Sequence, residues 1–257
     1  MKKIFEIKKT MLGMALVLAG LFFFQGHLMA EGSILSRTGV LNVTNPDGTV
    51  SVINPADVLS AIPSGSMVEL QGGSAVIAPT EGFIQLVVGG SVATIKAGDK
   101  VTVSIDPATG KVDFNVSAGQ ILIVSGNTTT TLAASQHALI TLDKAAGIAT
   151  IESLAGNIET VTVGVKTTIP QGSIGQSSAN AKTRDVHVES TQGPITVLAI
   201  DGKTTQLKGG QVLDTPGSAT GEIQTFDEGV QATIPRIEER RQPIREGQRV
   251  EGSPFAP

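Results

Sequence analysis

Short runs of alternating apolar and polar residues, separated by turn residues, fill the middle of the chain. The segment 84–116 shows the pattern clearly, because IQLVV, SVATI, KVTVSI and KVDFNV are separated only by Gly-Gly, by KAGD and by DPATG. Runs rich in β-branched residues and bounded by Gly, Pro and Asp are typical of short strands. Helical periodicity is missing, so the pattern predicts an all-β fold.

The same pattern returns every 37 residues. Four glycines stand 37 residues apart, and an isoleucine follows each by two positions: Gly82, Gly119, Gly156 and Gly193, with Ile84, Ile121, Ile158 and Ile195. A second apolar column lies thirteen residues after each glycine, one residue later in the last unit: Ile95, Leu132, Ile169 and Leu207. A third column follows three residues further on: Gly98, Ser135, Gly172 and Gly210. Three aligned columns in four consecutive units indicate a repeat architecture.

These columns divide an expected domain, residues 31–215, into about five units. Their approximate bounds are 48–81, 82–118, 119–155, 156–192 and 193–215. The first unit is the most divergent. Gly48 opens its TVSVI run, and its IPSGS at 62–66 echoes IPQGS at 169–173. An atypical terminal unit is the expected cap of a repeat protein.

Two architectures fit four short strands per unit. The units could stack as coils of an elongated β-solenoid or β-roll, or they could pair as a meander in a two-sheet sandwich. A propeller is disfavoured, because its blades usually carry aromatic or Trp-Asp signatures and this chain has no Trp. The recurring isoleucine column resembles an inward ladder, and it favours the solenoid.

The turns between runs also recur, and they account for the most conspicuous carboxylates. Asp106 and Asp143 open five-residue turns that end in glycine 37 residues apart, and Asp47 and Asp201 lie in similar turns. Asp accepts hydrogen bonds from turn backbone, so turn formation explains these residues. Calcium is the rival interpretation, but neither an EF-hand loop nor the nonapeptide calcium repeat is present.

Candidate catalytic and metal-binding residues are few. His137 and His187 occupy different repeat columns, and His187 lies in a strand-like VHVES beside Asp185 and Glu189. A metal site would require the two rings to converge. Without a histidine base the many Ser and Thr residues are not activated nucleophiles. The Gly-Gly pairs at 72, 89 and 209 precede no helix that could hold a phosphate. We therefore expect no catalytic residues, no metal, no cofactor and no enzyme activity.

A threonine-rich run, Thr128 to Thr131, has approximate counterparts at Thr167-Thr168 and Thr204-Thr205. A flat threonine ladder could bind a regular surface such as ice or carbohydrate. Threonine is also a favourable strand residue on a solvated face, and that is the interpretation we prefer.

The two ends of the chain differ from the repeats. Lys2, Lys3, Lys8 and Lys9 precede fourteen apolar residues, Met11 to Phe24, and the chain reaches Ala30 shortly afterwards. This layout predicts a signal peptide over 1–30, with the mature chain starting at Glu31. An uncleaved anchor is the alternative, but the apolar run falls short of the roughly 20 residues that span a bilayer. Residues 216–257 are rich in charge and proline, which predicts a disordered tail. Within it, RIEERRQPIRE at 236–246 could instead bind a partner.

Charge and aromatic content exclude further classes of ligand. The formal net charge is −4, and it becomes about −7 once the signal peptide is removed. An acidic chain is a poor ligand for nucleic acid. Trp and Tyr are absent, so stacking on bases or sugars has few available rings. Cysteine is absent too, which excludes disulfides and thiolate sites.

Two segments resemble the periplasmic portion of FecR-type proteins: GPITVLAIDGKTTQLKGGQV at 193–212 and SGSMVELQGGSAVI at 64–77. The likeness spans about residues 35–215. It implies a periplasmic β-rich domain, which in that family takes part in carrying a signal inward. This chain has no cytoplasmic segment before its apolar run, so the resemblance implies fold and compartment but not the sigma-factor switch.

The sequence therefore predicts an exported, non-catalytic envelope protein that binds an unidentified protein partner or acts as a sensory or scaffold module. Its expected location is the periplasm, the cell surface or the medium. A secreted structural or adhesive protein is the alternative.

Overall fold

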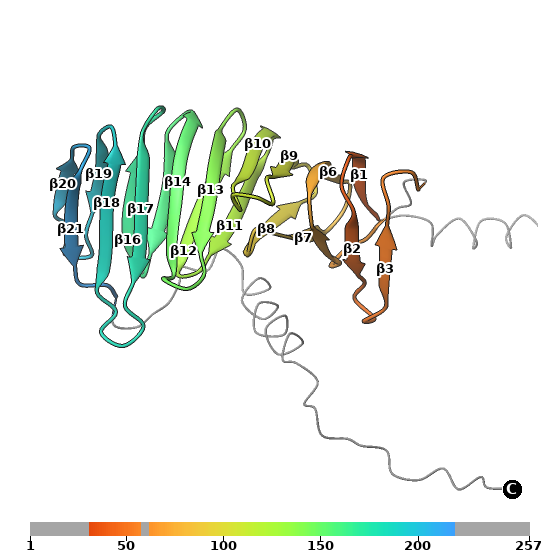
Figure 1. Cartoon of the computed structure of the whole chain (residues 1–257), viewed down its shortest axis with the longest axis horizontal. Coiled ribbons are helices and arrows are strands. Elements are labelled where there is room, and N and C mark those ends of the chain that lie inside the picture. The colour runs from red at the N-terminus through yellow and green to blue at the C-terminus, as the bar shows by residue number, and fades with distance from the viewer. Residues whose placement is uncertain (1–30, 58–61, 219–257) are drawn as a thin grey trace, which may run out of the picture.

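The computed structural model of the chain describes residues 31–57 and 62–218, which form two large β-sheets (Figure 1). Sheet A contains ten strands, in spatial order β21 (Gln211–Thr215), β18 (Val186–Gln192), β17 (Ile174–Ala179), β14 (Ile148–Ala155), β13 (His137–Asp143), β10 (Val112–Ala118), β9 (Lys100–Ile105), β6 (Gly73–Pro79), β1 (Glu31–Arg37) and β4 (Ile62–Pro63). Sheet B contains eleven: β20 (Thr204–Leu207), β19 (Ile195–Leu198), β16 (Val165–Ile169), β15 (Ile158–Thr162), β12 (Thr128–Ala133), β11 (Gln120–Ser125), β8 (Ser91–Lys96), β7 (Phe83–Val88), β5 (Met67–Leu70), β2 (Leu41–Thr44) and β3 (Val50–Ile53).

Three of the five expected units, 82–118, 119–155 and 156–192, each contribute one hairpin to each sheet. In the unit 82–118, β7 and β8 pair in sheet B, the chain crosses over, and β9 and β10 pair in sheet A. The units 119–155 and 156–192 repeat this order, and from residue 82 onward the strands that join successive units are antiparallel. The units stack side by side along the long axis of the molecule (Figure 1).

The all-β prediction is confirmed, and the two sheets have the arrangement of a β-sandwich. The sandwich was one of the two architectures that the sequence left open. The solenoid that the isoleucine column favoured is not what forms, because neighbouring strands are antiparallel hairpins and not parallel coils. A side-by-side hairpin stack produces the same inward ladder, so this column does not separate the two architectures.

The two apolar sequence columns face each other in sheet B. Ile84 pairs with Ile95, and the next three units repeat this pair as Ile121 with Leu132, Ile158 with Ile169, and Ile195 with Leu207. All eight side chains are buried. Burying an aliphatic side chain of this size stabilises a fold by about 1.5–3 kcal/mol. Each repeat of 37 residues thus adds one buried cross-strand pair to the core.

The first glycine column marks the crossing from sheet A to sheet B. Its four members have φ between 59° and 78°. At Gly119 a Cβ atom would overlap the side chain of Asp99, so the crossing needs both the left-handed backbone and the absent side chain. A β-bulge precedes three of these glycines, and the extra residues are again 37 apart: Ser117, Leu154 and Thr191. The bulges bend the strand towards the crossing.

The third column marks the return crossing from sheet B to sheet A, and Ser135 is its exception. Ser135 has φ 68°, whereas its glycine counterparts have φ between 79° and 89°. In three units, the residue that follows the third-column position closes the turn with a side-chain hydrogen bond. Asp99 Oδ2 accepts a hydrogen bond from Lys96 N at 2.7 Å, and Gln136 Oε1 accepts one from Ala133 N at the same distance. Gln211 and Lys208 repeat the contact.

The N-terminal region departs from the repeat. Six strands, β1 to β6, precede residue 82, and β5 pairs in parallel with β7 although every other strand pair of the described residues is antiparallel. The IPSGS echo has a structural counterpart. Ser66 N donates to Pro63 O at 3.1 Å, and Ser173 N donates to Pro170 O at 3.0 Å. This end has a different arrangement from the units that it precedes.

The expected signal peptide, 1–30, and nearly all of the expected tail, from 219 onward, lie outside the described residues. Strand β1 is described from Glu31, where the described residues begin. Within the part of the chain that the structure describes, no helix has the length and apolar character needed to cross a membrane.

The return crossing provides a test of backbone strain. Ser135→Gly should raise the free energy of unfolding by about 1 kcal/mol, because a non-glycine residue in the left-handed region costs about that much. Gly172→Ser should lower it by a similar amount, since a Cβ there meets no atom within 4 Å and only the backbone is strained. Urea denaturation of both variants measures the change. Equal midpoints for the two variants would contradict this account.

Candidate functional site

The C-terminal end of the sandwich leaves one edge strand of each sheet without a partner among the described residues. The units 82–118, 119–155 and 156–192 each contain four strands, but the last unit contains only β19, β20 and β21. Within residues 31–57 and 62–218, β20 pairs only with β19, and β21 pairs only with β18. We call these two strands the open end; they lie together at one tip of the molecule (Figure 1). Unpaired N–H and C=O groups along such edges can bind another strand.

The chain turns away from the open end after β21. Gly217 N donates to Arg184 O at 3.1 Å, and Ser218 N donates to Val163 O at 2.8 Å. Both carbonyls belong to hairpin turns of the preceding unit. The described chain therefore runs back along the stack, and it does not cover the free side of β21.

Apolar side chains remain exposed at the open end. Val212 of β21 is 47% exposed, while Leu198 and Ile200, at the end of the β19–β20 hairpin, are 40% and 50% exposed. On the inward face Leu207 is buried and Leu213 is half-buried against the core. The apolar layer between the sheets thus reaches the tip, and no other described segment covers it there.

Charge is sparse on the two edge strands. Asp214 is their single ionisable residue, and its Oδ1 lies 2.7 Å from His187 Nδ1 on the neighbouring strand β18. Lys203 and Lys208 flank β20 on either side. Lysine side chains at a free edge hinder pairing with another strand. No lysine directly flanks β21, so it is the more accessible of the two edges.

The opposite end of the sandwich differs from the open end in sheet A. There it finishes with β4, of which the structure describes two residues, and one of them, Pro63, has no N–H to donate. In sheet B it finishes with β3, a four-residue strand paired to β2 in a hairpin, on which Val50 and Val52 are 67% and 57% exposed. The two ends are therefore not equivalent.

The two histidines pair with separate carboxylates and do not converge. His137 Nε2 lies 2.7 Å from Asp113 Oδ1, across β13 and β10, whereas His187 pairs with Asp214. Strands β14 and β17 lie between the two pairs in sheet A. Across the described ranges, no group of three or more His, Cys, Asp or Glu side chains could hold a metal ion. Sequence reasoning named Asp185 and Glu189 beside His187 and missed its partner, because that partner lies on another strand.

All four turn aspartates hold the turns in which they lie. In each, a carboxylate oxygen accepts a backbone N–H two residues ahead: Asp47 from Thr49, Asp106 from Ala108, Asp143 from Ala145 and Asp201 from Lys203. Asn180, 37 residues after Asp143, closes the third turn of that column in the same way. These contacts support the turn interpretation.

The hydrogen bonds also affect ionisation. The Thr109 hydroxyl and then the Ala108 N–H lower the pKa of the Asp106 carboxyl, and the Thr49 hydroxyl and N–H lower the pKa of Asp47. Bonds to the charged form favour it over the protonated acid. Both carboxylates are fully exposed.

The solvated-face interpretation of the threonine run is wrong for most of it. Thr128, Thr129, Thr130 and Thr167 are buried, Thr131, Thr168 and Thr205 are half-buried, and only Thr204 is exposed. Thr128 Oγ1 lies 2.8 Å from Thr162 Oγ1 and 2.9 Å from Ser177 Oγ of sheet A. A threonine side chain can point into the core where its hydroxyl forms hydrogen bonds with hydroxyls of the opposite sheet. One unit earlier, Ser91 and Ser125 form the equivalent buried pair at 2.7 Å.

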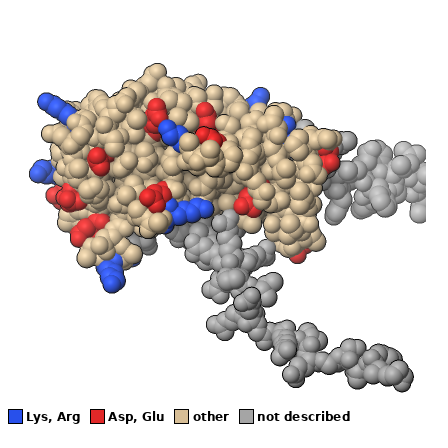
Figure 2. Space-filling model, viewed as in Figure 1, with Lys and Arg blue, Asp and Glu red and all other residues tan. Residues whose placement is uncertain are grey.

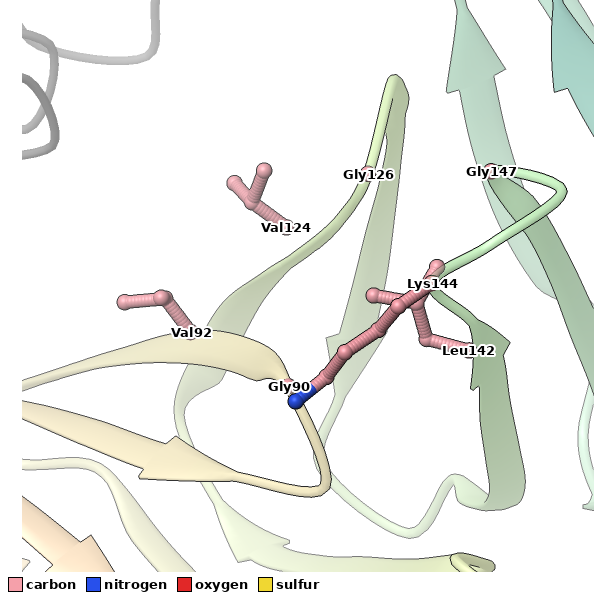
Figure 3. A pocket seen from close by; sticks show the side chains of 7 residues that line it. All are labelled: Gly90, Val92, Val124, Gly126, Leu142, Lys144 and Gly147. Atoms are coloured by element: carbon pink, nitrogen blue, oxygen red, sulfur yellow. The ribbon is translucent and has the colours of Figure 1, made fainter. Parts of the chain in front are cut away.

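A pocket of about 290 Å³ lies where hairpin turns of the two sheets approach one another (Figure 3). Its lining is glycine and aliphatic side chains with one cation: Gly90, Val92, Val124, Gly126, Leu142, Lys144 and Gly147. Lys144 reaches across to the turn at Gly90 (Figure 3). No acid or base accompanies the lysine in this lining, so the pocket has no acid–base pair for catalysis.

The face of the molecule shown in Figure 2 carries no large patch of like charge. Acidic and basic side chains are scattered singly or in small groups over that face (Figure 2). Comparisons of the chain with protein-family models, with curated proteins and with solved structures found no match. The open end is therefore the candidate site that the geometry itself provides.

The buried hydroxyls can be tested with a matched pair of variants. Thr128→Val should lower the free energy of unfolding by about 1–2 kcal/mol, because it removes two buried hydrogen bonds at nearly constant volume. Thr131→Val, on the same strand but half-exposed, should change it by less than about 0.5 kcal/mol. Chemical denaturation of the two variants measures the difference. A loss at Thr131 equal to that at Thr128 would show that the cluster has no special role.

Two of the turn aspartates, Asp47 and Asp106, predict how stability responds to acid. The folded pKa values of these two lie below the ordinary value of 3.8, so their contribution is present above that value and is lost as pH falls through the folded pKa. Asn keeps the turn geometry but does not titrate. The double variant Asp47→Asn, Asp106→Asn should therefore lose less stability than the native chain between about pH 5 and pH 2. Thermal unfolding over this range measures the slope, and parallel curves for the two proteins would refute the prediction.

Proposed function

We propose that this protein is an exported, non-catalytic module of the bacterial cell envelope that binds another protein by adding a strand at its open end. The observation that carries the proposal is the last unit, 193–215, which has three strands where the units before it have four. Among the described residues, the outer edges of β20 and β21 have no partner strand, and Leu198, Ile200 and Val212 are exposed beside them. Strand addition uses backbone groups for affinity and alternate side chains for specificity.

The remainder of the molecule supports a binding role over a catalytic one. The histidines form two separate pairs with carboxylates, and the turn aspartates are engaged by their own backbone. The stacked hairpins provide a scaffold on which an edge is held in place. Nucleic acid is a poor candidate partner because the chain is acidic.

The proposed cell compartment rests on the sequence alone. The N-terminal layout is that of a signal peptide, and the likeness to FecR-type periplasmic domains at 64–77 and 193–212 agrees with it. A periplasmic or surface location is therefore part of the proposal, as is a sensory or scaffold role. The sigma-factor switch of that family is not included.

The experiment that tests the proposal is site-specific photocrosslinking in intact cells. A photoreactive residue replacing Gln206, exposed on edge strand β20, should form a discrete adduct with a second protein chain. The same residue replacing Thr102, exposed on the outer face of sheet A and far from either edge, should not. Adducts of equal yield from both positions, or from neither, would overturn the edge as a binding site.

Cell fractionation separates this function from a secreted structural or adhesive role. The binding module should be recovered from the periplasm or bound to an envelope complex, as a species of defined size. Recovery in the medium as polymers of variable length would support the structural alternative instead.

A further inference from the structure

We propose that the open end binds a second copy of this chain, related by a two-fold axis and joined through β21. This inference rests on the proposed function, because it names the partner of the same edge. It requires a strand that pairs with its own copy, and both the geometry and the chemistry of β21 meet that requirement.

The geometry follows from how the units already associate. In each sheet, neighbouring units join through antiparallel strands, as β18 and β21 do in sheet A and β16 and β19 do in sheet B. A two-fold axis perpendicular to sheet A, placed beside β21, sets a second β21 antiparallel to the first. The same axis brings the two copies of β20 towards each other in sheet B. The dimer thus continues the stack with the same antiparallel pairing that joins neighbouring units, and its interface is isologous.

The two-fold rotation leaves the inward-facing side chains of β21 on the core side of sheet A and the outward-facing ones on its outer side. Residues opposite one another in a strand pair lie on the same face of the sheet. The half-buried Leu213 would therefore meet the core-facing side of the partner's strand, and the exposed Val212 would meet its outer side. Asp214 is already bonded to His187 at 2.7 Å, so no unpaired charge is brought to the axis from β21.

Head-to-tail growth is less well supported. It would require β21, with five residues, to pair in sheet A with β4, which has two residues and includes Pro63. Closed pairing of two open ends leaves the divergent N-terminal ends outermost. Edge strand β3 at those outer ends also has no outer partner among the described residues, but in sheet A the neighbouring edge β4 is too short to pair with a second sandwich, so the assembly would stop at two copies.

The dimer should be weak. One five-residue strand with its flanking side chains buries less than the roughly 1,200 Å² at which stable complexes begin. Lys203 of one copy would also approach Lys208 of the other at the ends of β20, and salt would screen this repulsion. We therefore expect dissociation constants of about 10–500 μM, tighter at higher ionic strength.

The test is sedimentation equilibrium of the chain 31–257 between about 5 μM and 1 mM, at low and high salt. The native mass should rise from one copy to two and then stop. Val212→Lys should remain at one copy, because an edge lysine blocks pairing while the position is exposed enough to accept it. Val52→Lys is the matched control, because Val52 is 57% exposed on edge strand β3 at the opposite end, and this variant should dimerise as the native chain does.

Three results would overturn the inference. They are a native mass of one copy throughout, a mass that rises beyond two copies, and loss of association in Val52→Lys as large as in Val212→Lys. If the native chain stays at one copy while the Gln206 crosslinker captures a different protein, the dimer fails and the proposed function stands. If neither association nor a crosslink is found, both fail.

Discussion

The structure depends on two crossings between sheets in every 37 residues. Each hairpin buries one face only, so the chain must move to the other sheet before the next hairpin can cover that face. Both crossings use residues in the left-handed backbone region, and the first also follows a bulge in three units. Because the crossings are fixed in length, the buried pairs between them return in register, and a stack of small hairpins behaves as a single sandwich.

The core that results is thin and almost free of aromatic side chains. Phe114 is the one aromatic among its largest fully buried side chains, and the others are Leu and Ile. Small hydroxyl residues fill part of the space between the sheets. Thr128, Thr162 and Ser177 satisfy one another there, so their burial costs less than that of unpaired groups. Such a core suits an elongated molecule, in which each unit touches only its neighbours.

The two ends of the stack differ in the edge strands that they expose. One end replaces the repeat with irregular strands and a proline-containing edge. At the other, the described residues end partway through a unit, and edge strand β21 has few charges and is backed by the half-buried Leu213. Natural sandwiches usually cover such an edge or place charges on it. We propose that a strand of another chain covers this one.

The sequence by itself determined the all-β class, and it placed the four strands of the segment 84–116 to within two residues. It could do so because alternation and turn chemistry are local. It also identified turn roles for Asp106 and Asp143, which bond to backbone only two residues away. Only the tertiary structure decided between solenoid and sandwich, since both stack the isoleucine column inward. It also decided that Thr128 faces the core and that His187 pairs with Asp214. Those contacts join strands separated by 27 residues or more, and no local pattern records which strands become neighbours.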